Sequence, residues 1–399
     1  MSSSPSRIAI VGAGIAGLTA ALALLQRGYD VDIFEQSVVL NEVGAGLQIS
    51  PNGVKVLMDL GLEERVARIS CAAAGKEVRL WNTGQTWKLF DLGEDSIARF
   101  GAPYWTVHRG DLHRVLLEAF RERMPDRLHT GRQCLDFRQT DSWVDLHFAD
   151  GSTGRYEAVV AADGVHSKAR HALVGSDAPY FTGLIAWRST IPISKLPAEL
   201  QRPVGVNWVG PGAHVITYPL RRGELLNFVG IVEKNDWSVE SWTSRGTRDA
   251  CAEDFRGWHP LVQTLTTAVE EPLKWALLGR PPLQCYAMGR VCLIGDAAHP
   301  TLPFLAQGAV MALEDGLVLA RCLERLRAPE AAFRRFDELR LKRTADIVRG
   351  SAENAKRFHH AELADPALAV AYVTREWKPD LVRRRYDWLF EYDPRSVAI

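Results

Sequence analysis

Three glycines, Gly12, Gly14 and Gly17, follow a short apolar stretch and open a longer one. This spacing is typical of a strand that turns into a helix around a bound pyrophosphate. The first glycine permits a tight turn, the second lets the backbone approach the phosphates, and the third lets the helix pack on the strand. Ile15 and Ala16 would then offer free N–H groups at the positive end of the helix dipole. The spacing therefore predicts dinucleotide binding.

An acidic residue stands where the ribose of such a dinucleotide needs one. We expect a helix over residues 15–26 that stops near Gly28, and then a strand over residues 31–35. Glu35 closes this strand 18 residues after Gly17, where an acid meets the ribose hydroxyls. The glycine pattern alone is weak, but strand, glycines, helix, strand and acid in this order make a strong signal.

A second glycine-containing turn lies far along the chain. The apolar residues 291–294 predict a strand that ends in Gly295 and Asp296, within the run Gly-Asp-Ala-Ala-His-Pro. Two such turns in one domain suggest one extended dinucleotide that is held at both ends. This arrangement points to FAD rather than to NAD.

His214 and Tyr218 are spaced for proton transfer on one side of a strand. They stand four residues apart in a strand-like segment, so both side chains face the same way. Histidine titrates near neutral pH and can accept the proton of a phenol. The alternative is a histidine and a tyrosine that merely pack on a sheet, and the spacing alone does not separate the two.

Size and charge exclude several classes of function. The chain has 399 residues, enough for a large core and two domains, and its 48 basic residues balance 48 acidic ones. We find no basic stripe for nucleic acid, because the densest basic run, residues 383–385, is flanked by aspartates. Residues 8–25 are uncharged and could alternatively form a signal peptide or a short membrane span. The complete nucleotide fingerprint favours a protein with no integral membrane segment.

Cysteine and histidine usage predicts neither disulfides nor a metal site. The six cysteines form no Cys-x-x-Cys pair and no metal-ligand spacing, which suits a reducing cytoplasm. His359 and His360 are adjacent and lack a third ligand nearby in the sequence, so we expect them on a surface helix. We therefore predict a cytoplasmic protein without a metal.

The elements that must position these residues suggest an α/β fold with an insertion. Residues 156–162 form a continuous apolar strand, as in a sheet buried on both faces, whereas residues 181–279 combine strand-like pieces with six tryptophans. We expect a discontinuous, Rossmann-like FAD-binding domain, an inserted β-rich substrate domain and a helical C-terminus. The ranges are 1–75, 100–180 and 280–340 for the FAD-binding domain, 76–99 and 181–279 for the substrate-binding domain, and 341–399 for the helical region.

Three motifs together resemble those of the single-component flavoprotein aromatic hydroxylases of the p-hydroxybenzoate hydroxylase fold. They are residues 12–17, residues 162–167 (Ala-Asp-Gly-Val-His-Ser) and residues 295–300. Their order and spacing match that family over nearly the whole chain. Residues 44–48, 104–109, 214–220 and 387–392 are further similar to segments of 3-hydroxybenzoate 6-hydroxylases, salicylate hydroxylases and 6-hydroxynicotinate 3-monooxygenases.

The resemblance implies how FAD would be held. Asp296 would accept a hydrogen bond from the ribitol, Asp163 would tie a turn near the pyrophosphate, and Arg109 would approach the cofactor. A helix that starts at Gly308 would direct its dipole toward the flavin and favour the anionic reduced form. The expected cofactor-binding residues are Gly12, Gly14, Ile15, Ala16, Gly17, Glu35, Gln36, Gly46, Leu47, Arg109, Asp163, Asp296, Gly308 and Ala309.

The resemblance also implies a reaction. NADH or NADPH would bind transiently and reduce FAD, and O2 would then form a flavin hydroperoxide that hydroxylates a small hydroxylated aromatic or heteroaromatic carboxylate. His214 and Tyr218 would be catalytic, and Gln48, Arg188 and Pro303 would contact substrate. An ordinary salt bridge remains an alternative for Arg188.

One residue departs from the 3-hydroxybenzoate enzymes, because Pro303 stands where those enzymes carry a glutamine on the substrate side. The choice between NADH and NADPH stays open, and so does the choice between a monomer and a homodimer. Two alternative functions also stay open, namely salicylate-type decarboxylative hydroxylation and a non-catalytic binding protein of the same fold.

Overall fold

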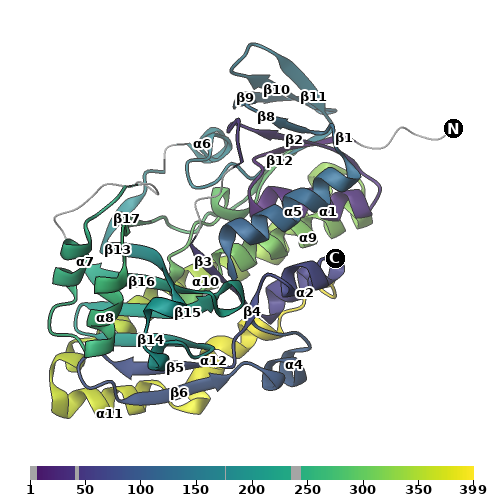
Figure 1. Cartoon of the computed structure of the whole chain (residues 1–399). Coiled ribbons are helices and arrows are strands. Elements are labelled where there is room, and N and C mark those ends of the chain that lie inside the picture. The colour runs from purple at the N-terminus through teal and green to yellow at the C-terminus, as the bar shows by residue number, and fades with distance from the viewer. Residues whose placement is uncertain (1–6, 41–44, 176, 235–243) are drawn as a thin grey trace.

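The computed structural model describes residues 7–40, 45–175, 177–234 and 244–399. Two large sheets dominate it, one in the upper half of Figure 1 and the other in the lower half. A small sheet of β3 (Gly46–Ile49), β7 (Trp105–His108) and β4 (Cys71–Ala72) lies between them. Four candidate site residues lie in this small sheet or directly after it, namely Gly46, Leu47, Gln48 and Arg109.

The upper sheet has six strands in the order β18-β19-β12-β1-β2-β8. Its central strands are parallel and carry apolar residues on both faces, as expected for a sheet covered on both sides. Two of the expected elements, the helix over residues 15–26 and the strand that ends at residue 35, are present. The strands are β1 (Arg7–Val11), β2 (Asp30–Glu35), β8 (Leu128–Thr130), β12 (Ala158–Ala161), β18 (Ala287–Met288) and β19 (Val291–Leu293).

Helices cover this sheet, and a three-stranded antiparallel sheet packs at its top edge (Figure 1). Helix α1 (Ile15–Gln26) packs on β1 and β2, and α5 (Arg109–Arg123) and α9 (Gly308–Leu326) pack against α1. Helices α2 (Pro51–Asp59) and α3 (Glu63–Ala67) lie against α9 and α5, and α6 (Lys168–Val174) contacts the three-stranded sheet. The three strands are β9 (Cys134–Gln139), β10 (Val144–Phe148) and β11 (Thr153–Tyr156). Helix α1 is buried over nearly its whole length, because α9 and α5 both pack against it.

The lower sheet has seven strands in the order β17-β13-β16-β15-β14-β5-β6. Successive residues alternate between its two faces. One face packs on helices α7 (Arg248–Asp254) and α8 (Pro260–Ala268), and the other faces the C-terminal helices. The strands are β5 (Gly75–Leu80), β6 (Thr86–Asp91), β13 (Tyr180–Pro192), β14 (Val204–Gly210), β15 (Ala213–Leu220), β16 (Leu225–Glu233) and β17 (Leu273–Gly279).

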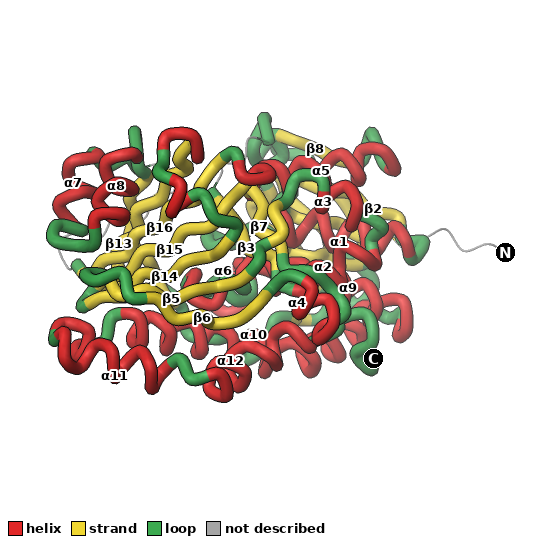
Figure 2. Tube along the Cα trace, turned by 60° about the horizontal axis from the view of Figure 1, so that its bottom comes forward, coloured by secondary structure: helices red, strands yellow, loops and turns green. Residues whose placement is uncertain are grey.

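The chain ends in helices, as the sequence predicts. Helix α10 (Pro329–Phe358) packs on α9 beside the upper sheet, and α11 (Pro366–Glu376) and α12 (Pro379–Glu391) line one side of the lower sheet in Figure 2. Helix α4 (Glu94–Phe100) contacts α12. The mixed α/β fold class is confirmed. The assignment of residue ranges to domains stays a prediction, and two of the six tryptophans, at positions 237 and 242, lie outside the described residues.

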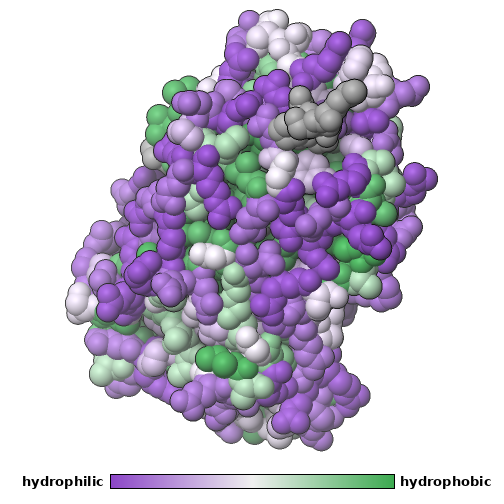
Figure 3. Space-filling view, turned by 90° about the vertical axis from the view of Figure 1, so that its right-hand side faces the viewer, coloured by the Kyte–Doolittle hydropathy of each residue, from purple (hydrophilic) through white to green (hydrophobic). Residues whose placement is uncertain are grey.

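The sequence predicts neither a membrane-spanning segment nor a metal site, and the described residues can be searched for both. None of their helices combines the length and apolar composition that a membrane crossing requires. Within the same residues, no three acidic, histidine or cysteine side chains gather as a metal site would require. On the face shown in Figure 3, hydrophilic side chains predominate and the hydrophobic ones form small separate groups.

Candidate active site

The three motifs meet at the carboxyl edge of the upper sheet. Strand β1 lies parallel to β12, and β12 lies parallel to β19, so the turns that follow them are neighbours. At Gly12, where φ is +105°, a Cβ atom would lie 2.3 Å from the carbonyl oxygen of Ala162. At Gly295, a Cβ atom would lie 2.8 Å from the Cβ of Ala16. A side chain at Gly12 would therefore collide with backbone, and one at Gly295, where φ is also positive, would collide with the Ala16 side chain.

Glu35 is fixed beside the first glycine turn. One of its carboxylate oxygens accepts a hydrogen bond from the Ala13 amide at 2.9 Å, and the other accepts from the Ser37 amide at 2.8 Å. Helix α1 begins with no side-chain cap and no acidic residue in its first turn. An uncapped N-terminus with free amides is the arrangement that a pyrophosphate uses.

A cavity of about 450 Å³ opens over these turns. Its walls include residues of three segments that the sequence predicts to be at the site, namely residues 12–14, Glu35 with Gln36, and Asp163. Other lining residues were not expected from the sequence: Ser37, Val39, Leu40, His113, Arg132, Gln133, Cys134, His166 and Lys168. The parallel pairing of β8 with β2 places residues 132–134 beside Glu35, and sequence alone does not reveal that pairing.

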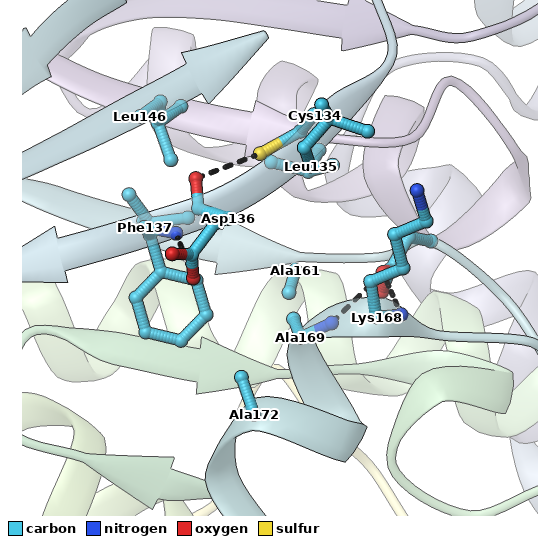
Figure 4. Close-up of a pocket in the computed structure, with 12 residues that line it drawn as sticks. Cys134, Leu135, Asp136, Phe137, Leu146, Ala161, Lys168, Ala169 and Ala172 are labelled. Carbon is cyan, nitrogen blue, oxygen red and sulfur yellow. Dashed lines mark hydrogen bonds between the residues drawn. The ribbon is translucent and has the colours of Figure 1, made fainter. Parts of the chain in front are cut away.

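A recess of about 20 Å³ adjoins this cavity and shares Val11, Cys134, Asp163 and Lys168 with it. Figure 4 shows its lining, in which Cys134 and Phe137 come from β9 and Ala169 and Ala172 from α6. Asp163 lies at its edge and accepts hydrogen bonds from the Ser167 hydroxyl at 2.5 Å and the Lys168 amide at 2.9 Å. Asp163 thereby caps the start of α6. Burial raises its pKa, although these hydrogen bonds oppose the shift.

These features fit a dinucleotide cofactor. A Cβ atom at Gly14 would meet nothing within 4 Å, whereas one at Gly17 would lie 2.0 Å from the Gly12 carbonyl oxygen. Gly17 is thus needed for packing, and Gly14 leaves space beside the helix N-terminus. Glu35, the uncapped amides of α1 and the 450 Å³ cavity supply the ribose acceptor, the phosphate donors and the volume that the adenosine end requires.

The second turn is held by a buried network of charges. The Gly295 amide donates to Asp315 at 2.9 Å, and His299 Nε2 lies 2.5 Å from the same carboxylate. Arg340 reaches Asp315 at 2.8 Å and Glu314 at 2.7 Å. Burial alone would raise the pKa of Asp315, but His299 and Arg340 hold the pKa below its usual value. We call this set, Glu314, Asp315, His299 and Arg340, the closed network.

The expected flavin-side residues lie around this turn. Asp296 has an exposed side chain, and Gly308 and Ala309 at the start of α9 keep partial exposure. Helix α9 also begins without a side-chain cap or an acidic first turn. Arg109 is partly buried, and its amide donates to the Ala45 carbonyl at 3.0 Å. Their roles toward FAD stay predictions.

A polar cluster occupies the start of β3. The Gly46 amide donates to the buried Asn227 at 2.8 Å, and its carbonyl accepts from Arg188 at 3.3 Å. A Cβ atom at Gly46 would lie 2.5 Å from the Tyr218 ring. Gln48 accepts a hydrogen bond from the Tyr104 hydroxyl at 2.8 Å. The structure thus brings Gln48, Arg188 and Tyr218 together and adds Tyr104 and Asn227, which sequence reasoning missed. Gly44, part of the expected glycine-rich loop, lies outside the described residues.

Electrostatics single out two members of this cluster. Burial raises the pKa of Tyr218 to about 12, although Arg188 and Gln48 oppose the shift. Burial lowers the pKa of Arg188, which is further lowered by the positive charge of Arg109. The Nε atom of Arg188 is buried without a hydrogen-bond partner, and its guanidinium lies 5.3 Å from the Trp275 ring. A partly buried cation whose Nε atom lacks a partner favours an anionic ligand.

His214 lies on the same face of the sheet as Tyr218, as its spacing predicts. Its side chain is fully buried, and Nδ1 lies 2.6 Å from His359 Nε2. The other ring nitrogen, Nε2, is buried without a partner. Between His214 and Tyr218 stands Ile216, which keeps partial exposure in an otherwise buried strand.

Two other residues complete this end of the site. The Phe304 ring packs against His214 with 5.2 Å between ring centres, and the exposed Pro303 precedes it. The expectation of a surface helix is wrong for His359, which is 7% exposed at the C-terminal end of α10. The sequence shows only an adjacent pair of histidines. This pair does not indicate that His359 contacts His214 on a strand far away in the sequence.

Comparison with known proteins agrees with this geometry. The chain matches the FAD binding domain family over residues 6–351. It is 38% identical to the 3-amino-4-hydroxybenzoate 2-monooxygenase of Streptomyces platensis, covering 100% of this chain and 99% of that protein. It is 37% identical to the 6-hydroxynicotinate 3-monooxygenase of Pseudomonas fluorescens, covering 89% and 92%.

Solved structures share the fold. Klebsiella pneumoniae HpxO complexed with FAD and uric acid superposes with a TM-score of 0.84 at 26% identity, covering 97% of each chain. A salicylate hydroxylase substrate complex gives a TM-score of 0.80 at 28% identity, covering 98% of this chain and 97% of that one.

The chain belongs to the FAD-binding domain family of flavoprotein monooxygenases. It is an FAD-dependent monooxygenase of the kind that uses NAD(P)H and O2. The expectations for family, fold class, enzyme class and cofactors are confirmed.

Proposed function

We propose that this enzyme hydroxylates a small hydroxylated aromatic or heteroaromatic carboxylate, with electrons from NADH or NADPH and oxygen from O2. The observation that carries the proposal is the sheet face on which Arg188, His214 and Tyr218 stand together, with one nitrogen of Arg188 and one of His214 lacking a hydrogen-bond partner. The names of its relatives support the substrate class, since those at 38% and 37% identity act on an aminohydroxybenzoate and a hydroxynicotinate.

FAD, when bound, would accept hydride from the nicotinamide and activate O2 for transfer of one oxygen atom to the ring. The residues 12–17, Glu35 and the 450 Å³ cavity would hold its adenosine half. Asp296 and the start of α9 would hold the flavin half, with Gly46, Leu47 and Arg109 nearby. The positive end of the α9 dipole favours negative charge there.

The chain's own residues prepare the substrate. His214 Nε2, buried and without a partner, would accept the proton of the ring hydroxyl, which raises electron density on the ring. Arg188 would pair with the carboxylate, because its contacts within the described residues are the Gly46 carbonyl, Tyr218 and the Trp275 ring, and none of these is a carboxylate. Tyr218 and Gln48 would orient the ring by hydrogen bonds, and Pro303 would border the same space.

The experiment that tests the function is a substrate panel. Purified holoenzyme is mixed with NADH or NADPH and with hydroxybenzoates, aminohydroxybenzoates and hydroxypyridine carboxylates, and nicotinamide oxidation, O2 uptake and products are measured. We expect at least one ring acid to stimulate oxidation and to be hydroxylated in proportion. Loss of CO2 in the product would instead identify decarboxylative hydroxylation. A colourless protein that cannot be reconstituted with FAD would contradict the proposal.

Two further assignments belong to the same proposal. All six cysteines are free, which supports a reducing cytoplasmic location. The protein would act as a monomer or homodimer without nucleic acid.

A further inference from the structure

Three titratable side chains form a continuous hydrogen-bonded line from a buried face of the lower sheet to the surface. His214 Nδ1 lies 2.6 Å from His359 Nε2, and His359 Nδ1 lies 2.9 Å from a carboxylate oxygen of Glu233. The His359 side chain is 2% exposed, whereas that of Glu233 is 56% exposed. The line thus begins at the unpartnered His214 Nε2 and ends in solvent.

The carboxylate at the outer end fixes which ring nitrogens carry hydrogen. An ionised Glu233 can only accept, so the Nδ1 atom of His359 must donate. In a neutral His359 the other nitrogen, Nε2, is then an acceptor, and Nδ1 of His214 must donate to it. This leaves a lone pair on His214 Nε2, the ring nitrogen that has no hydrogen-bond partner. One exposed carboxylate therefore sets the tautomers of two buried rings.

We propose that His214, His359 and Glu233 form a proton relay that carries the hydroxyl proton of the substrate from the active site to solvent and returns it to the product. The relay rests on the proposed function, because it needs a substrate with an ionisable ring hydroxyl.

Each transfer in the relay is balanced. The substrate O–H bond breaks as an N–H bond forms at His214 Nε2, and the Nδ1 proton of His214 passes to His359 Nε2. The Nδ1 proton of His359 then passes to Glu233 and on to water. Both rings end neutral with exchanged tautomers, and the substrate is left as its anion. When the product takes up a proton at the same oxygen, the transfers run inward and restore the starting tautomers.

The surroundings favour neutral rings that pass a proton rather than store charge. Burial lowers the pKa of His214 well below its usual value, and the positive charge of a protonated His359 would lower it further. Burial also lowers the pKa of His359, although Glu233 opposes the shift. The rings of Phe304 and Phe358 pack against His214 from η5 (Pro303–Leu305) and α10. These rings offer no hydrogen-bond acceptor, so a proton on His214 Nδ1 has His359 as its acceptor.

Charged groups near the outer end have partners of their own. Arg357 donates to Asn354 at 2.8 Å, and His360 lies 3.6 Å from Glu362. The neighbour of Glu233 in sequence, Lys234, pairs with Asp254. These pairs leave the carboxylate of Glu233 as the acceptor that His359 meets.

The first test needs no substrate. Histidine-labelled holoenzyme is examined by 15N NMR, which distinguishes a protonated from an unprotonated ring nitrogen, and resonances are assigned with His214→Gln and His359→Gln. We expect Nδ1-H tautomers for both rings in the wild type. In Glu233→Gln, whose amide can donate, we expect an Nε2-H tautomer to appear at both. An Nε2-H tautomer at His214 in the wild type, or no change in Glu233→Gln, would overturn the relay.

The second test follows the proton itself. Holoenzyme is mixed in a stopped-flow instrument with 3-hydroxybenzoate, 3-amino-4-hydroxybenzoate or 6-hydroxynicotinate in weak buffer that contains a pH indicator. We expect proton release on binding to slow by about 100-fold in His359→Gln, the scale of general acid–base catalysis, and by less in Glu233→Gln. Glu233→Asp, which restores the carboxylate, should recover part of the rate.

The matched control is His360→Gln, which replaces the adjacent histidine that stacks on Tyr372 outside the line. Proton release in this variant should equal the wild-type rate. Equal rates in His359→Gln and His360→Gln would overturn the relay. If none of the three acids binds, the proposed substrate class fails, and the NMR result still decides whether the tautomers are set as proposed.

Discussion

Two buried histidines in this molecule differ in where their hydrogen bonds end. His299 bonds to Asp315, which also accepts from the Gly295 amide and from Arg340, and all of these side chains are buried. His214 bonds to His359, and that line ends at Glu233, whose side chain is 56% exposed. The first set closes on buried ions, whereas the second opens to solvent.

The difference distinguishes a network that fixes the structure of a turn from a line of side chains that can move a proton. In the closed network Arg340 pairs with both Glu314 and Asp315, and a neighbouring arginine, Arg343, also pairs with Glu314. Moving a proton there would leave a charge unbalanced in the core. Its effect is to fix the turn that approaches α1. In the line of His214, His359 and Glu233, a proton that enters at His214 can leave at Glu233, and neither histidine ring keeps a net charge.

The largest effect is expected from breaking the closed network. Arg340→Met leaves Glu314 and Asp315 with less positive charge at full burial, and breaking a buried ion pair typically costs roughly 3–5 kcal/mol. We expect a free energy of unfolding lower by about this amount, together with loss of FAD. Urea denaturation and the flavin content of the purified protein measure both.

The control for this variant is Arg334→Met, an exposed arginine on the same helix. It removes the same charge and should change stability by less than about 0.5 kcal/mol. Equal losses of stability in Arg340→Met and Arg334→Met would show that the closed network does not stabilise the fold more than an exposed arginine does.

A pair of histidine variants tests the comparison directly. His214→Gln should retain FAD but lower hydroxylation by about 100-fold, the scale of a lost general base, and should release more of the reduced oxygen as peroxide. His299→Gln should lower FAD retention and stability, while the fraction of nicotinamide oxidation coupled to hydroxylation, per bound flavin, stays close to the wild-type value. The measurements are product per NAD(P)H oxidised and peroxide yield. Unchanged turnover and coupling in His214→Gln would refute its role as the base.

Acid denaturation gives a third, intermediate effect. The pKa of Asp315 is held below its usual value in the folded protein, so the ionised carboxylate stabilises the fold above its unfolded pKa of about 4. This contribution is lost as pH falls through that value toward the lower folded pKa. We expect the free energy of unfolding to fall below pH about 5 in the wild type, and less steeply in Asp315→Asn. Parallel curves for the two proteins would exclude Asp315 as a source of acid sensitivity.

The same comparison explains how far the sequence could be interpreted. The nucleotide motifs are local, since residues 12–17 and Glu35 lie within one strand–helix–strand unit, and the glycine spacing together with the order of strand, helix, strand and acid predicts their shape. The strand period also predicted that His214 and Tyr218 share a face, which the register of β15 with β16 supports. Structural features that depend on a short stretch of one helix or strand can therefore be predicted from the sequence.

The partners that give these residues their chemistry were not recoverable. His359 is 145 positions from His214, and Glu233 is 126 positions from His359. Asn227 and Gly46, a hydrogen-bonded pair, are 181 positions apart. Such contacts depend on how β3, β16 and the end of α10 pack together, and no periodicity or composition within one segment encodes that packing. The same reason explains why His359 was wrongly expected on the surface.

The smallest expected effect is on stability at the open end of the line. Because the Glu233 side chain is 56% exposed, its pairing with His359 is screened by water, and exposed ion pairs contribute about 0–1 kcal/mol. Glu233→Gln should therefore change the free energy of unfolding by less than about 1 kcal/mol, as measured by urea denaturation. Arg340→Met, which breaks the buried closed network, should change the free energy of unfolding several times more. A large loss in Glu233→Gln would mean that this carboxylate also holds the fold, and any slower proton release in that variant would then have a structural cause rather than a change of tautomer.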